Sequence, residues 1–211
     1  MPYRRPKEPP SHEELMRLFE KAIKGLVQRF LDHPYAFYTE NDLHCYLYHR
    51  LYAGGKVNGL YRTADGYETI LLHKEYPTCV RYRRGTGGIL EESDQGPRRG
   101  AFDISIWDPQ VVSEHEHRRQ KVLCAAELAL NECGAGNPHT INDTAKLAST
   151  NNGVKYGYLL FFVRNSKDYK RNEEKIRKNL EEAAKKVRVA FTCVDESSKP
   201  RSEFPGPWGM V

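Results

Sequence analysis

The sequence predicts an α/β fold in which a mixed central sheet is flanked by helices. Its 211 residues are 39% apolar, enough for a single domain to bury a core. Apolar residues recur with the two-residue period of strands in some segments and at helical spacing in others. Strand-like and helix-like segments alternate along the chain, and the sequence contains no internal repeat. We therefore expect one domain at 11–195, preceded by a loose, proline-rich arm at 1–10 and followed by an irregular tail at 196–211.

Two helix starts carry capping patterns. Ser11 followed by Glu14 precedes apolar residues at helical spacing, which predicts a helix at about 12–32. Thr39 followed by Asp42 repeats the pattern and predicts a helix that begins at Glu40 and that a pair of glycines ends.

The remaining elements follow from the same two periods. We expect two strands within 57–77 around a turn at 64–66, the second running from Tyr67 to Tyr76 and ended by Pro77. The later elements, in chain order, are strands at 99–109 and 121–130, a short helix from Asn142 to about Ser149, a strand at 156–163, a charged helix at about 167–186 and a strand at 187–195. Polar loops are expected at 81–100 and 109–120.

Two of these strands each carry one carboxylate among apolar residues. Glu127 shares a strand face with Leu123, Ala125 and Ala129, and Asp103 lies on the strand before it. An ionised carboxylate in a core is costly unless it meets a cation or a metal. If the two strands are neighbours, Asp103 and Glu127 can share a divalent ion; the alternative is that each forms a buried salt bridge.

This arrangement resembles the PD-(D/E)XK nuclease superfamily, and within it a restriction-type group of proteins. The resemblance covers most of residues 35–165: the helix FYTENDLHCYLYHRLY, the strand ending LLHKEYPT, the Asp103 strand, AAELAL, INDTAKLAST and the strand YGYLLFFVR. It implies a restriction-endonuclease-like fold and metal-dependent hydrolysis of phosphodiester bonds, with Mg²⁺ or Mn²⁺ held by Asp103 and Glu127. The helical acid of the family corresponds to Glu40, whose place at a helix N-terminus is also explained by the helix dipole alone.

Ala129 departs from the family pattern, because the family has lysine two residues after the strand acid. A methyl group cannot stabilise charge on a phosphate, so the resemblance implies impaired catalysis. Lys146, which follows Asp143 in a pattern similar to the family's Asp-x-x-Lys-Leu, is a candidate to supply the charge or to bind phosphate; the ordinary alternative is a solvated helix lysine. Ala129 reflects either a natural loss of catalysis or an introduced Lys→Ala substitution, and the survival of both acids favours the second.

The chain is mildly basic, with a net charge of +5 and a pI near 8.9. This permits a polyanionic partner without requiring one. Arginines of the loop at 81–100 are candidate phosphate contacts, although the acids of the same loop can balance them: Arg83, Arg84, Arg98 and Arg99. The expected partner is nucleic acid, with DNA and a restriction or defence role implied by the resemblance; a homodimer or a partner protein is also possible.

The location and the enzymatic nature of the protein rest on weaker signals. The first ten residues lack the apolar core of a secretory signal, and no segment approaches the ~18 apolar residues of a membrane span, so we expect a cytoplasmic protein without a membrane partner. Five cysteines without a CxxC pair argue against a zinc site or a disulfide framework. The alternative to a nuclease is a catalytically inactive protein of the same fold that binds nucleic acid or a protein.

Overall fold

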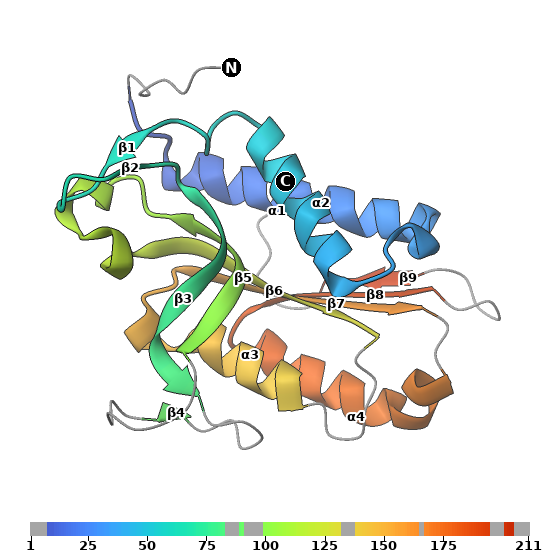
Figure 1. The fold of residues 1–211 in the computed structure, drawn as a ribbon. Helices are drawn as coiled ribbons and strands as arrows, with labels where there is room; N and C mark the ends of the chain where they lie inside the picture. Colours follow the sequence, from blue (N-terminus) through green and yellow to red (C-terminus); the bar gives the residue numbers. More distant parts are fainter. Residues whose placement is uncertain are drawn as a thin grey trace.

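The fold is a mixed sheet with helices on both faces (Figure 1), seen in a computed structural model that describes residues 8–82, 89–90, 99–131, 138–164, 167–194 and 201–204. The helices are α1 (His12–Asp32), α2 (Glu40–Ala53), α3 (Pro138–Ala148) and α4 (Lys167–Ala184). The strands are β1 (Tyr61–Arg62), β2 (Glu68–Thr69), β3 (Leu72–Tyr82), β4 (Ile89–Leu90), β5 (Arg99–Trp107), β6 (Val122–Leu130), β7 (Tyr156–Arg164), β8 (Arg188–Val194) and β9 (Arg201–Glu203). The expected α/β class with a mixed, helix-flanked sheet is confirmed.

Strands β3 to β9 form one sheet in the order β4-β3-β5-β6-β7-β8-β9, and β1 pairs only with β2. Neighbours are antiparallel from β4 to β6, parallel from β6 to β8, and antiparallel again between β8 and β9. The parallel steps require crossover connections, and α3 and α4 supply them. Strand β5, which carries Asp103, and strand β6, which carries Glu127, are neighbours, as a shared ion would require.

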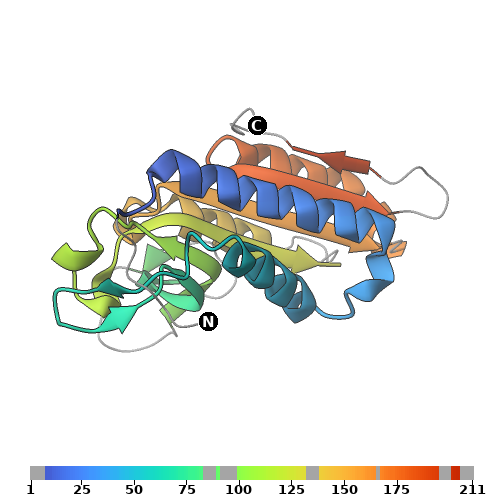
Figure 2. The same cartoon turned by 90° about the horizontal axis from the view of Figure 1, so that it is seen from above.

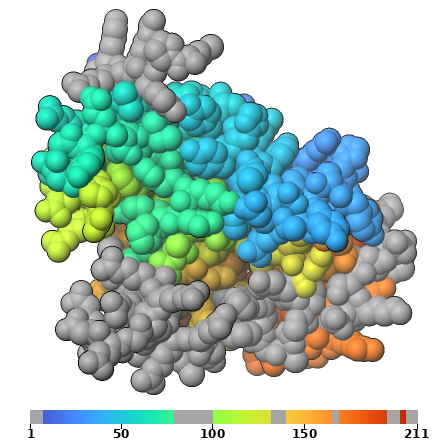
Figure 3. All heavy atoms as spheres, viewed as in Figure 1, coloured from blue at the N-terminus to red at the C-terminus, as the bar shows by residue number. Residues whose placement is uncertain are grey.

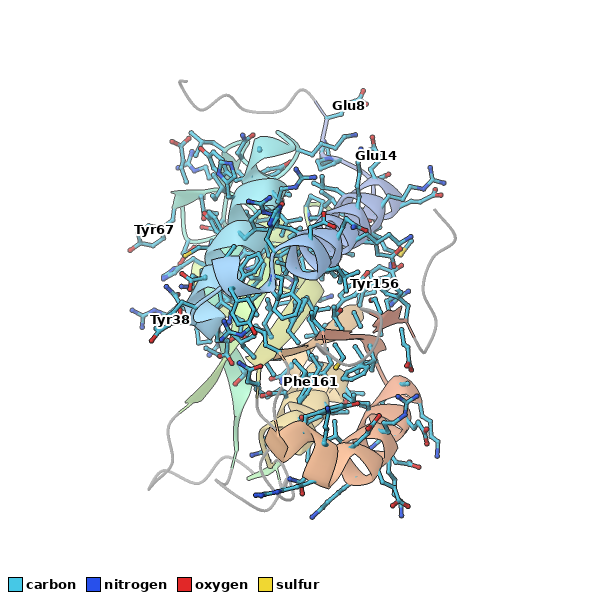
Figure 4. The ribbon with its side chains drawn as sticks, turned by 90° about the vertical axis from the view of Figure 1, so that its right-hand side faces the viewer. Glu8, Glu14, Tyr38, Tyr67, Tyr156 and Phe161 are labelled. Carbon is cyan, nitrogen blue, oxygen red and sulfur yellow. The ribbon has the colours of Figure 1, made fainter. Side chains whose placement is uncertain are left out.

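Helices α1 and α2 cover one face of the sheet, and α3 and α4 cover the other (Figures 1 and 2). The aromatic side chains of β7 identify the two faces. Tyr158 packs 4.9 Å from the ring of Phe19 on α1, whereas Phe161 packs 6.2 Å from Phe191, which stacks on Tyr169 of α4. Phe161 accordingly lies on the α4 side in Figure 4. Because side chains alternate along a strand, odd-numbered β7 residues face α3 and α4.

The helix starts are formed as the capping patterns predict. Ser11 accepts a hydrogen bond from the backbone N–H of Glu14, whose carboxylate accepts one from the N–H of Ser11. Asp42 accepts hydrogen bonds from the N–H groups of Tyr38 and Thr39, which fixes the chain entering α2. Tyr38 itself is 84% exposed and points away from the body (Figure 4).

Several predicted boundaries are wrong. Pro77 does not end a strand: it lies inside β3 and pairs with Ala101, next to a register shift that reaches Arg81. Proline has no backbone N–H, and at an irregular position in the strand pairing no hydrogen bond from that residue is needed. The segment from Tyr67 contributes two separate strands, of which β2 closes the short hairpin with β1.

The loops and the tail also contain more regular structure than predicted. Strands β3, β4 and β5 occupy parts of 81–100, and two 3₁₀ turns, Val112–Glu114 and His117–Arg119, lie within 109–120. Helix α3 begins at Pro138 rather than Asn142, since proline suits the first turn of a helix. The tail is not wholly irregular, because β9 pairs with β8. None of the helices in the described ranges has the length and apolarity needed to cross a membrane.

Candidate metal and acid–lysine site

The site lies where β5 and β6 separate. The antiparallel register pairs Ile104 with Ala126, so the next positions along it are Asp103 and Glu127. Here the carboxylate of Asp103 replaces a backbone acceptor: its Oδ2 accepts a hydrogen bond of 2.7 Å from the N–H of Leu128. Asp103 is thus anchored at the opening between the two strands, and its side chain remains 20% exposed.

Strand β3, on the other side of Asp103, is irregular at the same level. The register pairs Lys74 with Ile104 and Tyr76 with Phe102, which leaves Glu75 across from Asp103. Glu75 has a left-handed backbone with a φ of 55°, an uncommon conformation for a residue other than glycine. Its side chain is 72% exposed, so this acid does not extend the site.

Glu127 lies on the opposite sheet face from α1 and is almost completely buried. It shares its strand face with Ala129, which pairs with Phe161 in the parallel register, and this face is covered by α3 and α4. The Nζ of Lys146, on α3, lies 2.7 Å from Glu127 Oε2 and 3.0 Å from Asp143 Oδ1. It also donates to the carbonyl of Ala101 at 3.0 Å. A helix therefore places an ammonium group beside the strand acid, on the face where Ala129 carries only a methyl group.

The charges of this group are strongly coupled. Burial, together with the charges of Asp143 and Asp103, raises the pKa of Glu127 well above its usual range, and Lys146 opposes that rise. Burial alone would lower the pKa of Lys146, but the carboxylates of Glu127 and Asp143 outweigh it and raise this pKa above its ordinary value. Lys146 is therefore a fixed positive charge at neutral pH.

A second group of side chains meets Asp103 from the α2 side of the sheet. Glu40 and His44 are one helical turn apart on α2, and ligand atoms of Glu40, His44 and Asp103 all lie within 4.8 Å of one another. His44 Nε2 is 3.3 Å from Asp103 Oδ2 and 3.9 Å from Glu40 Oε1. Two carboxylates and an imidazole at these distances can hold a metal ion.

The sequence-based site residues are thus divided between two groups, which Asp103 and Glu127 link through the register of β5 and β6. Glu40 and Asp103, both expected as ligands, belong to the group that can hold a metal. Glu127 is not part of that group and forms an ion pair with Lys146. His44 was not predicted, although its spacing of four residues from Glu40 places both on one side of α2 and was an available signal.

The candidate phosphate-binding arginines are not placed by these contacts. Arg83, Arg84 and Arg98 lie outside the described residues. Arg99 begins β5 opposite Arg81, but its side chain is likewise outside the described part.

A groove of about 540 Å³ runs between α2 and β3, lined by Cys45, Tyr48, Ile70, Leu72, His73 and Lys74. Figure 3 shows this side of the molecule, where the surfaces of α2, in light blue, and β3, in green, adjoin. The groove adjoins the metal-binding group along α2, since Cys45 follows His44, and Lys74 donates a hydrogen bond to Asn41, which follows Glu40.

Comparisons of the chain with protein-family models, with curated proteins and with solved structures give no match.

Proposed function

We propose that this protein is a metal-dependent nuclease that hydrolyses phosphodiester bonds in nucleic acid. The observation that carries the proposal is the position of Lys146: its ammonium group is held by Glu127 and Asp143, and Glu127 follows the Ile104–Ala126 pair at the register position of Asp103, a member of the group that can hold a metal. A fixed cation and a metal ion can both stabilise the negative charge that develops when a phosphodiester is hydrolysed.

The residues present fit a divalent metal. His44 Nε2, within the group of Glu40, His44 and Asp103, is buried and makes no hydrogen bond. A buried polar atom without a partner costs about 1–3 kcal/mol, and a cation at this position would give lone pairs of this kind a partner. When bound, the metal would polarise the scissile phosphate and lower the pKa of a water molecule.

Each protein residue then has a role that its position supports. Asp103 and Glu40 hold the ion, and the bond from Leu128 N–H keeps Asp103 oriented. Lys146 stabilises negative charge that develops on the phosphate, and its ion pair favours the ionised form of Glu127 against burial. In this proposal Ala129 does not abolish catalysis, because the lysine charge comes from α3 instead of from β6.

The remaining features of the proposal rest on the PD-(D/E)XK resemblance or on the sequence. These are the nuclease fold itself, DNA as the nucleic acid, a restriction or defence role, Mg²⁺ or Mn²⁺ as the ion, a cytoplasmic location and phosphate contacts from the arginines of 81–100.

A second candidate function is nucleic-acid or protein binding without catalysis. One observation favours it: the three protons of the Lys146 ammonium match the three acceptors around it, on Glu127, Asp143 and Ala101. A lysine whose donors are all used inside the protein can serve the fold alone, as in other buried ion pairs.

Cleavage assays separate the two candidates. Labelled single- and double-stranded DNA and RNA are incubated with the protein and Mg²⁺ or Mn²⁺, and the wild type is compared with Asp103→Asn, Lys146→Ala and a control, Lys24→Ala, on the exposed side of α1. A nuclease loses about 10²–10³ in rate with either site substitution and nothing with the control. Absence of cleavage on all four substrates by folded, metal-loaded wild type would favour the binding function.

A further inference from the structure

His44 occupies the centre of the metal-binding group. Its Nε2 lies 3.3 Å from Asp103 Oδ2 and 3.9 Å from Glu40 Oε1, so both carboxylates converge on one ring nitrogen. Glu40 and Asp103 come from different layers of the fold, α2 and the sheet. The imidazole is the side chain that lies within reach of both.

The environment of this nitrogen is unusual for a core histidine. The side chain of His44 is only 9% exposed, and its Nε2 is inaccessible to solvent yet makes no hydrogen bond. Buried imidazoles are ordinarily hydrogen-bonded, because an unmet polar atom is costly. A buried ring nitrogen that faces two carboxylates and makes no hydrogen bond is placed to bind a cation between them.

The chemistry of the three donors selects among cations. Mg²⁺ prefers a shell of oxygen atoms and keeps several of its waters, whereas imidazole suits the divalent ions of the first transition row. One nitrogen and two carboxylates leave positions open for water or a phosphate oxygen. We infer that His44 is a direct ligand and that the site takes a divalent first-row transition ion, such as Mn²⁺ or Co²⁺, in preference to Mg²⁺.

This inference shares its metal site with the proposed function, but its test does not require cleavage. The full chain is titrated with MnCl₂, CoCl₂ and MgCl₂ by calorimetry, with the thermal shift as a second readout. Two variants of α2 are compared: His44→Gln, which replaces the ring nitrogen by an amide, and His49→Gln, a control at an exposed histidine of the same helix. The wild type and the control bind Co²⁺ and Mn²⁺ at least about tenfold more tightly than Mg²⁺, and His44→Gln loses most of this preference.

A spectroscopic readout on the wild type guards against a variant that fails to fold. Pulsed electron paramagnetic resonance of the Mn²⁺-loaded protein should show a directly bound nitrogen, and the Asp103→Asn variant should lose the bound ion. Equal affinities for Mg²⁺ and Mn²⁺, absence of nitrogen coupling in the wild type, or coupling that persists in folded His44→Gln would each overturn the inference. Nitrogen ligation without cleavage would support the inference about His44 and argue against the nuclease function. Cleavage with a Mg²⁺ site made only of oxygen ligands would support the nuclease function and argue against the inference.

Discussion

Lys146 Nζ on α3 lies 2.7 Å from Glu127 Oε2 on β6, and this contact joins a helix to the strand that carries the buried acid. The lysine charge is thus supplied from outside the strand, at a face where position 129 offers only a methyl group. For catalysis the position of the ammonium group in space matters, and the lysine that carries it can stand at residue 146 or, as a substitution, at residue 129. This makes the location of the charge itself open to experiment.

The first prediction concerns moving the lysine. Lys146→Ala should reduce metal-dependent cleavage by about 10²–10³, because one preorganised charge at the transition state is removed. Adding Ala129→Lys to that variant should restore part of the rate, since residue 129 shares a strand face with Glu127. Single-turnover rates of the four proteins in this cycle measure the effect. No recovery in a folded double variant would mean that the strand position cannot reach the phosphate.

Ala129→Lys alone tests the idea that the chain is impaired by its alanine. If position 129 is a true catalytic vacancy, this variant gains orders of magnitude in rate, and Glu127→Gln abolishes the gain. Because Lys146 already neutralises Glu127, we expect a second buried ammonium to add little cleavage and to lower stability.

The second prediction concerns stability. The side chains of Lys146 and Glu127 are 12% and 4% exposed, so Lys146→Met leaves buried carboxylates without their counter-ion. Such a change costs about 3–5 kcal/mol in the free energy of unfolding. Adding Glu127→Gln should recover a large part of it, because the uncompensated charge is removed. Urea unfolding of both single variants and the double variant gives the coupling; strictly additive effects would argue against a direct ion pair.

The third prediction tests the arginines of the loop at 81–100. Reversing Arg83 and Arg84, or Arg98 and Arg99, to glutamate should weaken nucleic-acid binding and flatten its salt dependence, by about 0.7–0.9 in the logarithmic slope for each phosphate that the protein no longer neutralises. Reversal of Lys175 and Lys178 on the exposed side of α4 is the matched control. Fluorescence anisotropy at several salt concentrations measures both quantities. Equal weakening in all three variants would mean that the change in net charge, and not the loss of specific arginine contacts, lowers the affinity.

The fourth prediction is a pH dependence from His73. Burial lowers the pKa of His73 to about 4, while its Nε2–H donates to the carbonyl of Ile70. The unfolded chain, with a pKa near 6.5, binds the proton first as the pH falls. Stability from this group is therefore full above pH ~6.5 and declines toward pH ~4, by up to about 3 kcal/mol.

The His73→Phe variant isolates this effect, because it keeps a ring to stack on Trp107, 3.9 Å away in the wild type, but cannot take up a proton. Unfolding free energies are measured from pH 4 to pH 7, and the value for the wild type minus that for the variant should decrease as the pH falls. His49→Gln, at an exposed histidine, should show no such trend. A constant difference across the range would mean that His73 is protonated as readily in the folded chain as in the unfolded one.

The residues that sequence patterns placed well are those whose position depends on local periodicity. Capping patterns located the starts of α1 and α2, and alternation put Asp103 and Glu127 each on a strand; that the two strands are neighbours came from the structure. His44 was missed because its contact with Asp103 joins residues that are distant in sequence. Lys146 was only one alternative among several, since its reach to Glu127 depends on how α3 packs beneath β6.

The boundary errors have the same origin. Pro77 predicts a strand end by its own chemistry, yet the irregular pairing with β5 accommodates it. Strand β9 has no pattern of its own and exists through its pairing with β8. In both cases the partner strand, and not the local sequence, determines the structure.

The hydrogen bond from Leu128 N–H to Asp103 has a mechanical consequence. At this position a side-chain hydrogen bond, and not a backbone one, joins β5 to β6. A ligand that binds the Asp103 carboxylate competes for an oxygen that also accepts the hydrogen bond from Leu128 N–H, and it therefore also affects the pairing of the two strands. The hydrogen-exchange rate of the Leu128 amide therefore measures, without any substrate, how stable its hydrogen bond to Asp103 is.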